Sequence, residues 1–250
     1  PDADLARAVD EALAAAKPGK EPVVLGEGAG RKLLERVGIP FPRGATARSE
    51  DEAVELAARI GYPLVLKIDS PDISHKSDVG GVRVGIGDEQ ALRQAYRAIL
   101  ESVRRHHPEA RIDGVLVVAM AGDGLETICG VQRDPVFGPV VLFGMGGLYA
   151  EVFKDSAIAL CPVTPDEARR LILRTRIGRI LSGLRGQRPY DLDATSDLLA
   201  RLSRWAAAEP RLREVDLNPV RVRPQGEGVQ ALDALVVLDS TIDPARGGSA

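Results

Sequence analysis

Cysteine, aromatic residues and long apolar runs are scarce in this 250-residue chain, and each shortage excludes a class of protein. The two cysteines, Cys129 and Cys161, provide neither a disulfide framework nor the ligand spacing of a structural zinc site. Aromatic residues make up only 4% of the chain, which argues against stacking platforms for nucleic-acid bases. No apolar run reaches the roughly 18 residues that are needed to span a bilayer.

An excess of either charge is also missing. The 33 basic and 36 acidic residues give a net charge of −3, so no overall positive field attracts nucleic acid or anionic membranes. The acidic, amphipathic start shows no secretory signal, and we expect a cytoplasmic location. Because Pro1 is not an initiator residue, we expect a processed chain or a piece of a longer one.

The composition that remains, 44% hydrophobic and 28% charged, is typical of a globular protein with a sizeable core. Helical and strand periodicities alternate, which predicts an α+β or α/β protein with two lobes. Capping boxes at Ser49 and Thr164 and a cap at Asp88 mark three helix starts. Further helices are expected over 5–13, 32–37 and 193–208, and strands over 64–68, 82–86, 115–119, 127–132, 140–143, 214–223 and 229–238.

The lobe boundary is expected near the segment 120–124, which is rich in glycine. We therefore expect an N-terminal helix or extension over 1–20, a first lobe with a leading helix over 21–119, and a second lobe over 120–240. The tail 241–250 is of low complexity and is expected to be loose.

Lys67 is unusual because it interrupts an apolar strand on the same face as Val65. It is either a charged residue that protects a sheet edge or a fixed cation for phosphate oxygens. Gly80 and Gly81 follow, and successive glycine amides can form a nest for an anion. Taken alone, the two glycines also suit an ordinary loop that leads into a hairpin.

His75 lies between these two features and is followed by Lys76. A histidine ring nitrogen can accept a phosphoryl group as a covalent relay, and the adjacent lysine would offset the charge. A single loop histidine is more often simply exposed, so this interpretation depends on its neighbours. Glu126, before the expected strand 127–132, is a surface glutamate or an acceptor for ribose hydroxyls.

The C-terminal hairpin provides the strongest local argument. Asp216 and Asn218 are two apart in a strand and share a face. If Arg223 pairs with Gly228 across the turn, Asn218 lies opposite Asp233. Carboxylate and amide oxygens are ligands that Mg²⁺ prefers, so the three residues are candidate metal ligands. The alternative is an ordinary edge-strand carboxylate, and a one-residue slip of register would separate the side chains.

A second glycine loop covers 143–148 and is followed by Glu151 and Asp155. It has neither the lysine and hydroxyl of a Walker loop nor the spacing of the dinucleotide fingerprint. We interpret it as a loop close to a phosphate or to a loop of a partner.

Six segments together resemble the β subunit or domain of the NDP-forming acyl-CoA synthetases, which include ADP-forming acetyl-CoA synthetases and are related to succinyl-CoA synthetase. The resemblance extends from about Gly26 to Leu238, and its segments are GYPLVLKI (61–68), SPDISHKSDVGGV (70–82), DPVFGPVVLFGMGG (134–147), EVFKDSAIALCPV (151–163), EVDLNPVRV (214–222) and ALDALVVL (231–238).

This resemblance implies an ATP-grasp fold, in which two lobes clamp ATP or ADP with Mg²⁺. It implies that Lys67 binds nucleotide phosphates and that Gly80 and Gly81 form a flexible loop over them. Glu126 would bind the nucleotide, the adenine would be bordered by Val118, Ala119 and Met120, and magnesium would be held by Asp216, Asn218 and Asp233. His75, beside Lys76, would relay phosphate from a partner's histidine to ADP. The pair Val118-Ala119 departs from the family's usual Gln or Glu followed by Pro.

The implied reaction is acyl-CoA + ADP + phosphate ⇌ carboxylate + CoA + ATP, of which this chain performs the phosphoryl transfer. A CoA-binding α subunit or fused α domain, which would also bind the carboxylate or acyl-CoA, is the expected partner in a hetero-oligomer. Two alternatives stay open: an ATP-grasp carboxylate ligase without a relay histidine, and a non-catalytic, regulatory synthetase-like module of a protein acetyltransferase. The presence of all the implied site residues favours catalysis.

Overall fold

The computed structural model describes residues 3–16, 22–147, 155–183, 186 and 188–242. Four features expected from the sequence lie partly or wholly outside these residues: the N-terminal helix or extension over 1–20, Leu148 of the second glycine loop, Glu151 and the tail over 241–250. None of the described helices is long and apolar enough to cross a membrane.

The described chain forms two compact units. Unit 1 contains 1–23, 30–41 and 122–250, and unit 2 contains 24–29 and 42–121. The expected division between 119 and 120 differs in three places: 120–121 groups with unit 2, whereas 21–23 and 30–41 group with unit 1. The backbone of 30–41 is bonded to unit 1 through Ala231, whose amide donates to the Pro40 carbonyl at 2.8 Å.

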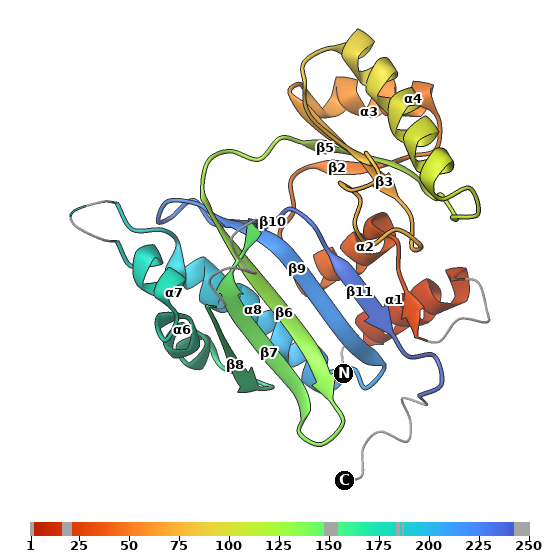
Figure 1. Ribbon diagram of the computed structural model, residues 1–250. Helices are drawn as coiled ribbons and strands as arrows, with labels where there is room; N and C mark the ends of the chain where they lie inside the picture. Colours follow the sequence, from red (N-terminus) through yellow and green to blue (C-terminus); the bar gives the residue numbers. More distant parts are fainter. Residues whose placement is uncertain (1–2, 17–21, 148–154, 184–185, 187, 243–250) are drawn as a thin grey trace. The chain divides into compact units, whose positions relative to one another are not determined.

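Unit 2 is a four-stranded antiparallel sheet in the order β2-β5-β3-β4, with two helices on one face (Figure 1). Leu64, Leu66 and Ile68 of β3 point toward the helices and join the buried core. The elements are β2 (Gly44–Ala47), α3 (Glu50–Ile60), β3 (Leu64–Asp69), β4 (Val82–Ile86), α4 (Glu89–His106) and β5 (Gly114–Ala119).

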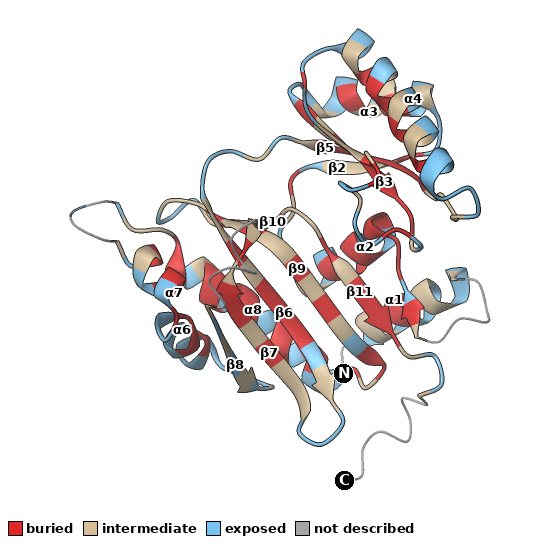
Figure 2. Cartoon of the chain, viewed as in Figure 1, coloured by how far each residue is buried: buried red, intermediate tan, exposed pale blue. Residues whose placement is uncertain are grey.

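The helix starts of unit 2 follow the sequence patterns. The Asp88 side chain caps α4, and the Ser49 side chain caps α3 by accepting from the Glu52 amide. Glu52 reaches back to the amide of Arg48 rather than to that of Ser49, so the capping box is displaced by one residue. Both helices bury one side and expose the other, as Figure 2 shows.

Unit 1 is built on a seven-stranded sheet in the order β1-β11-β9-β6-β7-β8, with β10 paired to β9. Helix α8 packs against β6, β7 and β9, and α6 and α7 pack against β7 (Figure 1). The elements are α1 (Ala3–Ala15), β1 (Val23–Val24), β6 (Leu125–Asp134), β7 (Gly138–Met145), β8 (Ser156–Leu160), α6 (Pro165–Leu173), α7 (Arg176–Leu181), α8 (Leu192–Ala208), β9 (Leu212–Val222), β10 (Val229–Ala231) and β11 (Leu235–Leu238).

Helix α2 (Glu27–Val37) contributes its first residues to unit 2 and the rest to unit 1. It begins five residues before the expected start at Lys32. A remote side chain stabilises this start: the amide of Gly28 donates to Asp69, 41 residues away, at 3.1 Å. A local sequence pattern cannot reveal a cap of that kind.

The strand expected over 229–238 is interrupted, and this expectation is corrected to two strands, β10 and β11. Opposite the gap lies Pro219, which has no amide hydrogen to donate to the ladder. Asp233 turns its carboxylate onto the amide of Ala234 at 2.9 Å instead of continuing the strand. Strands β2 and β8 were not expected from the sequence.

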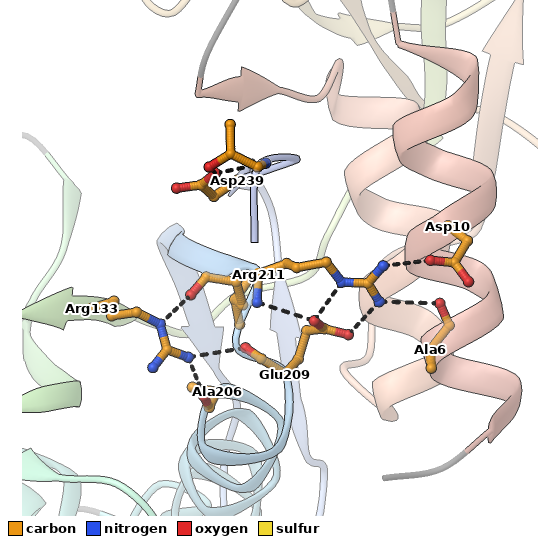
Figure 3. Close-up of polar contacts among 9 residues, drawn as sticks. Ala6, Asp10, Arg133, Ala206, Glu209, Arg211 and Asp239 are labelled. Atoms are coloured by element: carbon orange, nitrogen blue, oxygen red, sulfur yellow. Dashed lines mark hydrogen bonds and ion pairs between the residues drawn. The ribbon is translucent and has the colours of Figure 1, made fainter. Parts of the chain in front are cut away.

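A buried polar network holds α1 to the start of β9, and we call it the Arg211 network (Figure 3). The Arg211 guanidinium binds both carboxylate oxygens of Glu209, at 2.7 and 2.8 Å, and also the Asp10 carboxylate on α1. Arg133 from β6 donates nearby to the carbonyls of Ala206 and Glu209, near the end of α8. Every arginine in this network therefore has partners that fix its place.

Candidate functional site

Lys67 lies in β3 on the face opposite helices α3 and α4, and it is only 8% exposed. The expectation that it shares a face with Val65 is confirmed, because both alternate with the core residues of the strand. It is a central residue of the sheet rather than an edge residue, since β3 pairs with β4 on one side and β5 on the other. The edge-protection interpretation is therefore wrong.

The ammonium group of Lys67 meets a carboxylate that the sequence analysis did not single out. Lys67 Nζ lies 2.8 Å from Glu27 Oε1, and Lys76 Nζ lies 3.1 Å from Glu27 Oε2. The side chains of Glu27, Lys67 and Lys76 are 3%, 11% and 10% exposed. We call these three residues the Glu27 cluster. It places two buried lysines, both predicted site residues, on one carboxylate.

Close packing at the start of α2 puts Glu27 in this place. The carboxylate of Asp69 accepts from the amide of Gly28 at 3.1 Å and from the Thr46 hydroxyl at 2.7 Å. A Cβ atom on Gly28 would lie 2.2 Å from the Thr46 hydroxyl oxygen and 2.3 Å from an Asp69 oxygen. Only glycine therefore allows the first turn of α2 to approach β3 so closely.

His75 is exposed and lies on the loop that joins β3 to β4, directly before Lys76. Two amides of this loop, which were predicted to form an anion nest, bond within the loop here. The Gly81 amide donates to the Lys76 carbonyl at 2.7 Å, and the Gly80 amide donates to the Ser77 carbonyl at 3.1 Å. The loop is thus a closed turn, and its role over phosphates stays a prediction.

The residues predicted to border the adenine lie at and just beyond the end of β5. Val118 is buried and pairs with Val65, whereas Met120 is 47% exposed. The Ala119 amide donates to the Arg43 carbonyl, and the Met120 amide donates to the Pro63 carbonyl. Their contact with adenine remains untested.

In unit 1, Glu126 of β6 pairs with Arg221 of β9 across the sheet. Glu126 Oε1 lies 2.5 Å from Arg221 Nη2, and Arg221 Nη1 donates to the Gly122 carbonyl at 2.9 Å. Arg221 Nε is buried without a hydrogen-bond partner among the described residues. Arg221 is a further residue that the sequence analysis missed, because its partner is 95 positions away.

The second glycine loop contacts two predicted site residues. The amide of Gly146 donates to the Glu126 carbonyl at 3.2 Å, and the amide of Gly147 donates to the side-chain oxygen of Asn218 at 3.3 Å. Gly147 has a φ of +70°, and a Cβ there would lie 2.4 Å from a Glu126 carboxylate oxygen. The structure therefore joins this loop, Glu126 and Asn218 in one place.

The predicted register of the C-terminal hairpin is confirmed. Arg223 bonds to Gly228 across the turn, Val229 lies opposite Val222, and Leu235 lies opposite Asp216. By this register Asn218 lies opposite Asp233, in the gap between β10 and β11.

Glu214, Asp216 and Asn218 alternate with buried Val215 and Leu217 and share the other face of β9. Burial, together with the charges of Glu214 and Asp233, raises the pKa of Asp216 to about 6. A bound cation would offset the negative charges that surround the Asp216 carboxylate.

The donor set fits Mg²⁺ in its chemistry, because two carboxylates and one amide are all hard oxygen ligands. Among the described residues, no group of three or more His, Cys, Asp or Glu is arranged to hold a metal ion by itself. The amide of Asn218 would have to complete the set. The metal role of Asp216, Asn218 and Asp233 therefore stays a prediction.

The fold and these residues agree with a known family of nucleotide-binding folds. Residues 19–238 match the model of the ATP-grasp domain, and the chain therefore belongs to the ATP-grasp family. The expected family and fold are confirmed, with antiparallel sheets in each unit.

Two curated relatives show which branch this chain resembles. It is 48% identical over 213 residues to the ADP-forming acetate–CoA ligase I of Archaeoglobus fulgidus, covering 85% of this chain and 31% of the relative. It is 37% identical over 228 residues to the β subunit of the ADP-forming acetate–CoA ligase I of Pyrococcus furiosus, covering 91% and 97%. The chain thus spans about a third of the first relative and nearly all of the second.

Solved structures agree with this assignment. The dinucleotide-forming acetyl-coenzyme A synthetase 1 of Candidatus Korarchaeum cryptofilum, in complex with coenzyme A and Ca-AMPCP, is 40% identical with a TM-score of 0.85 over 92% of this chain and 98% of that one. A second structure of that synthetase contains Mg-AMPPCP and a phosphohistidine segment that points towards the nucleotide-binding site. It is 36% identical, with a TM-score of 0.74 over 86% of this chain and 93% of that one.

The predicted site residues therefore fall into two groups, one in each unit. Unit 2 brings together Lys67, Lys76 and the loop that carries His75, and it adds Glu27. Unit 1 brings together Glu126, Asn218 and the second glycine loop, and it adds Arg221.

Proposed function

We propose that this chain is the nucleotide-binding, phosphoryl-transferring component of an ADP-forming acyl-CoA synthetase. The complete reaction would be acyl-CoA + ADP + phosphate ⇌ carboxylate + CoA + ATP. One observation carries the proposal: an exposed histidine, His75, directly precedes a lysine whose ammonium group shares the Glu27 carboxylate with Lys67. The lysines proposed to bind phosphate and the histidine proposed to accept it thus belong to adjacent elements of one unit.

In the proposed step, a phosphoryl group on a ring nitrogen of His75 passes to the terminal oxygen of ADP. The N–P bond breaks, an O–P bond to ADP forms, and the histidine ring recovers a proton. Lys67 and Lys76 would stabilise the negative charge on the transferring oxygens, and electrostatic stabilisation of this kind is the main contribution that proteins make to phosphoryl transfer.

Unit 1 carries the other residues to which we assign nucleotide-binding roles. Glu126, oriented by Arg221 at 2.5 Å, would accept hydrogen bonds from the ribose hydroxyls. Asp216, Asn218 and Asp233 would hold Mg²⁺, which neutralises phosphate charge when it is bound. The raised pKa of Asp216 supports this assignment, because a cation would relieve the repulsion from Glu214 and Asp233.

CoA and the acyl group would bind to another component. The P. furiosus relative of almost the same length is named a β subunit, and the A. fulgidus relative is about three times longer. We therefore propose a CoA-binding α component, either a separate subunit of a hetero-oligomer or a fused domain.

The test is phosphohistidine formation in the reverse direction. The 250-residue chain, incubated with Mg²⁺ and ATP labelled in the γ-phosphate, should acquire label that is stable to base and labile to acid. Unlabelled ADP should remove the label as ATP. The His75→Asn variant should acquire none, whereas His107→Asn, which changes another exposed histidine in the same unit, should match the wild type.

Three results would contradict the proposal. Label that persists in His75→Asn would show that His75 is not the acceptor. A wild-type chain that binds ATP in calorimetry but acquires no label would favour a ligase without a relay histidine, and a chain that binds no ATP would favour a regulatory module.

A further inference from the structure

Glu27 is a buried carboxylate, 4% exposed, that contacts both of the lysines predicted to bind phosphate. Its two oxygens contact two different lysines, at 2.8 and 3.1 Å. One lysine belongs to strand β3, and the other belongs to the loop that carries His75. A single side chain thus connects a fixed element of the sheet with the predicted relay loop.

The surroundings of Glu27 are built to hold it in place. It is the first residue of α2, and the next residue, Gly28, is tied to Asp69 in β3. Asp69 in turn binds Thr46 of the neighbouring segment β2. Three elements of unit 2 therefore determine where the Glu27 carboxylate lies, while the lysine side chains that reach it are long and flexible.

We propose that Glu27 is a positioning residue for phosphoryl transfer. It sets the ammonium groups of Lys67 and Lys76 relative to each other and thereby fixes the loop of His75. This inference rests on the function proposed above and names a residue on which that function depends.

Glu27 restricts the positions that two flexible lysine side chains can adopt. A lysine side chain has four rotatable bonds, and an ammonium group without a fixed partner samples many positions. Because both ammonium groups contact the same carboxylate, the position of Glu27 limits where each of them can lie. Lys76 is bonded through the backbone to His75, so a fixed Lys76 limits where the imidazole can be. Misplacement by about 1 Å can reduce a rate by about 100-fold.

The experiment measures the single-turnover rate at which labelled ATP phosphorylates the chain, over a range of ATP concentrations. The Glu27→Gln variant keeps the size of the side chain and removes the charge that holds two ammonium groups. We expect its rate at saturating ATP to fall by about 10- to 100-fold, with a smaller change in the ATP concentration that gives half the maximal rate. The matched control is Glu35→Gln, which breaks a partly buried ion pair with Arg31 on the same helix.

The fraction of chain that becomes labelled separates positioning from folding. A merely structural role would reduce the amount of competent protein, and therefore the final amount of label, but not the rate of each folded molecule. Glu27→Asp keeps the charge on a shorter side chain and should recover part of the rate. It also provides the test if the glutamine variant fails to fold, because a wild-type rate for Glu27→Asp would then overturn the proposal.

A double-mutant cycle tests the route through Lys76. Lys76→Met should slow the transfer, and adding Glu27→Gln should slow it by less than the product of the two separate effects. Independent, multiplying effects would show that Glu27 does not act through Lys76. A Glu27→Gln rate within twofold of the Glu35→Gln rate would overturn the whole inference. An unlabelled wild-type chain would instead overturn the proposed function itself.

Discussion

Each unit contains a cluster of ion pairs with a buried centre, and we assign different roles to the two clusters. In the Arg211 network of unit 1, one guanidinium meets two carboxylates, and all three of its nitrogens have partners (Figure 3). In the Glu27 cluster of unit 2, one carboxylate meets two ammonium groups. The first has a flat, rigid cation with fixed bonding directions, and the second has two compact cations on flexible side chains.

The difference shows how a structural ion cluster can be told from a functional one. A guanidinium whose nitrogens are all engaged holds elements together, and here it fixes α1 to the start of β9. Lysines that converge on one buried carboxylate can reorient toward an incoming anion. The Arg211–Glu209 pair is as buried as the Glu27 cluster, so the type of cation distinguishes the two.

The largest effect is expected for Arg211→Met, which should destabilise unit 1. Glu209 is 6% exposed, and without Arg211 its charge would stay buried and uncompensated. Breaking such a pair costs about 3–5 kcal/mol, which corresponds to a fall of roughly 6–20 °C in the midpoint of thermal unfolding. Calorimetry of the full chain measures it. The control, Arg7→Met, breaks an exposed pair with Asp4 and should shift the midpoint little.

The comparison fails if the phosphorylation rate of each folded Arg211→Met molecule falls as much as that of Glu27→Gln. Equal losses would mean that both clusters contribute to phosphoryl transfer. The type of cation would then not distinguish a structural ion cluster from a functional one.

Asp216 provides an intermediate case, because it is surrounded by charges of its own sign. Its pKa is raised from 3.8 to about 6, so the folded state favours the protonated carboxyl. The resulting loss of stability is absent below about pH 4, grows as the pH rises through 6, and is complete above it. At pH 7.5, Asp216→Asn should stabilise the chain by about 1–2 kcal/mol, allowing for solvent screening at this partly exposed group.

Unfolding measured at pH 7.5 and at pH 3.5 checks this sign. The gain should be present at the higher pH and absent at the lower one, and Mg²⁺ should stabilise the wild type more than the variant. Asp123→Asn, at an exposed position, is the control. A gain of equal size at both pH values would show that ionisation of Asp216 is not its cause.

The smallest effect is expected at Glu50. This residue shows what a carboxylate with two cationic partners contributes when the cluster is exposed to solvent. Like Glu27, it meets two cations, Arg93 at 2.9 Å and Arg97 at 2.6 Å, but Arg97 is 71% exposed. Hydrogen bonds from Arg97 and Arg93 lower the pKa of Glu50 to about 2, so its contribution to stability is present above pH 4.5 and is lost as the pH falls through 2.

Glu50→Gln should lower the thermal midpoint slightly at pH 7, by less at high salt, and leave the phosphorylation rate unchanged. The control is Glu101→Gln, an exposed residue that pairs with a single arginine, Arg105. If Glu50→Gln lowered the thermal midpoint as much as Arg211→Met, exposure to solvent would not weaken the ion pairs of Glu50.

Features encoded by neighbouring residues could be predicted from the sequence. The capping box at Thr164 and the cap at Asp88 depend on residues three positions apart, and both form. The register of the C-terminal hairpin follows from its turn, so the position of Asn218 opposite Asp233 could be derived before the structure was known. The face of Lys67 followed from simple alternation along β3.

The remaining features depend on contacts between distant segments. Glu27 and Lys67 are 40 residues apart, and Glu126 and Arg221 are 95 apart, so no local pattern connects them. Strand β8 was missed because its apolar residues, Ile158 and Leu160, are on the exposed face of an edge strand. One clue to Glu27 was available: it stands between Gly26 and Gly28, where a close approach of the backbone is to be expected.

The irregular pairing of β6 with β9 has a practical consequence. Leu217 lies opposite Cys129 and Val220 opposite Thr127, so β9 has two residues, Asn218 and Pro219, where β6 has one. This extra residue reverses the alternation of β9, and as a result Arg221 shares a face with Asp216 rather than entering the core. Anyone who transplants this hairpin into another scaffold must keep the extra residue, because deleting it would send either the acidic row or the arginine to the wrong side.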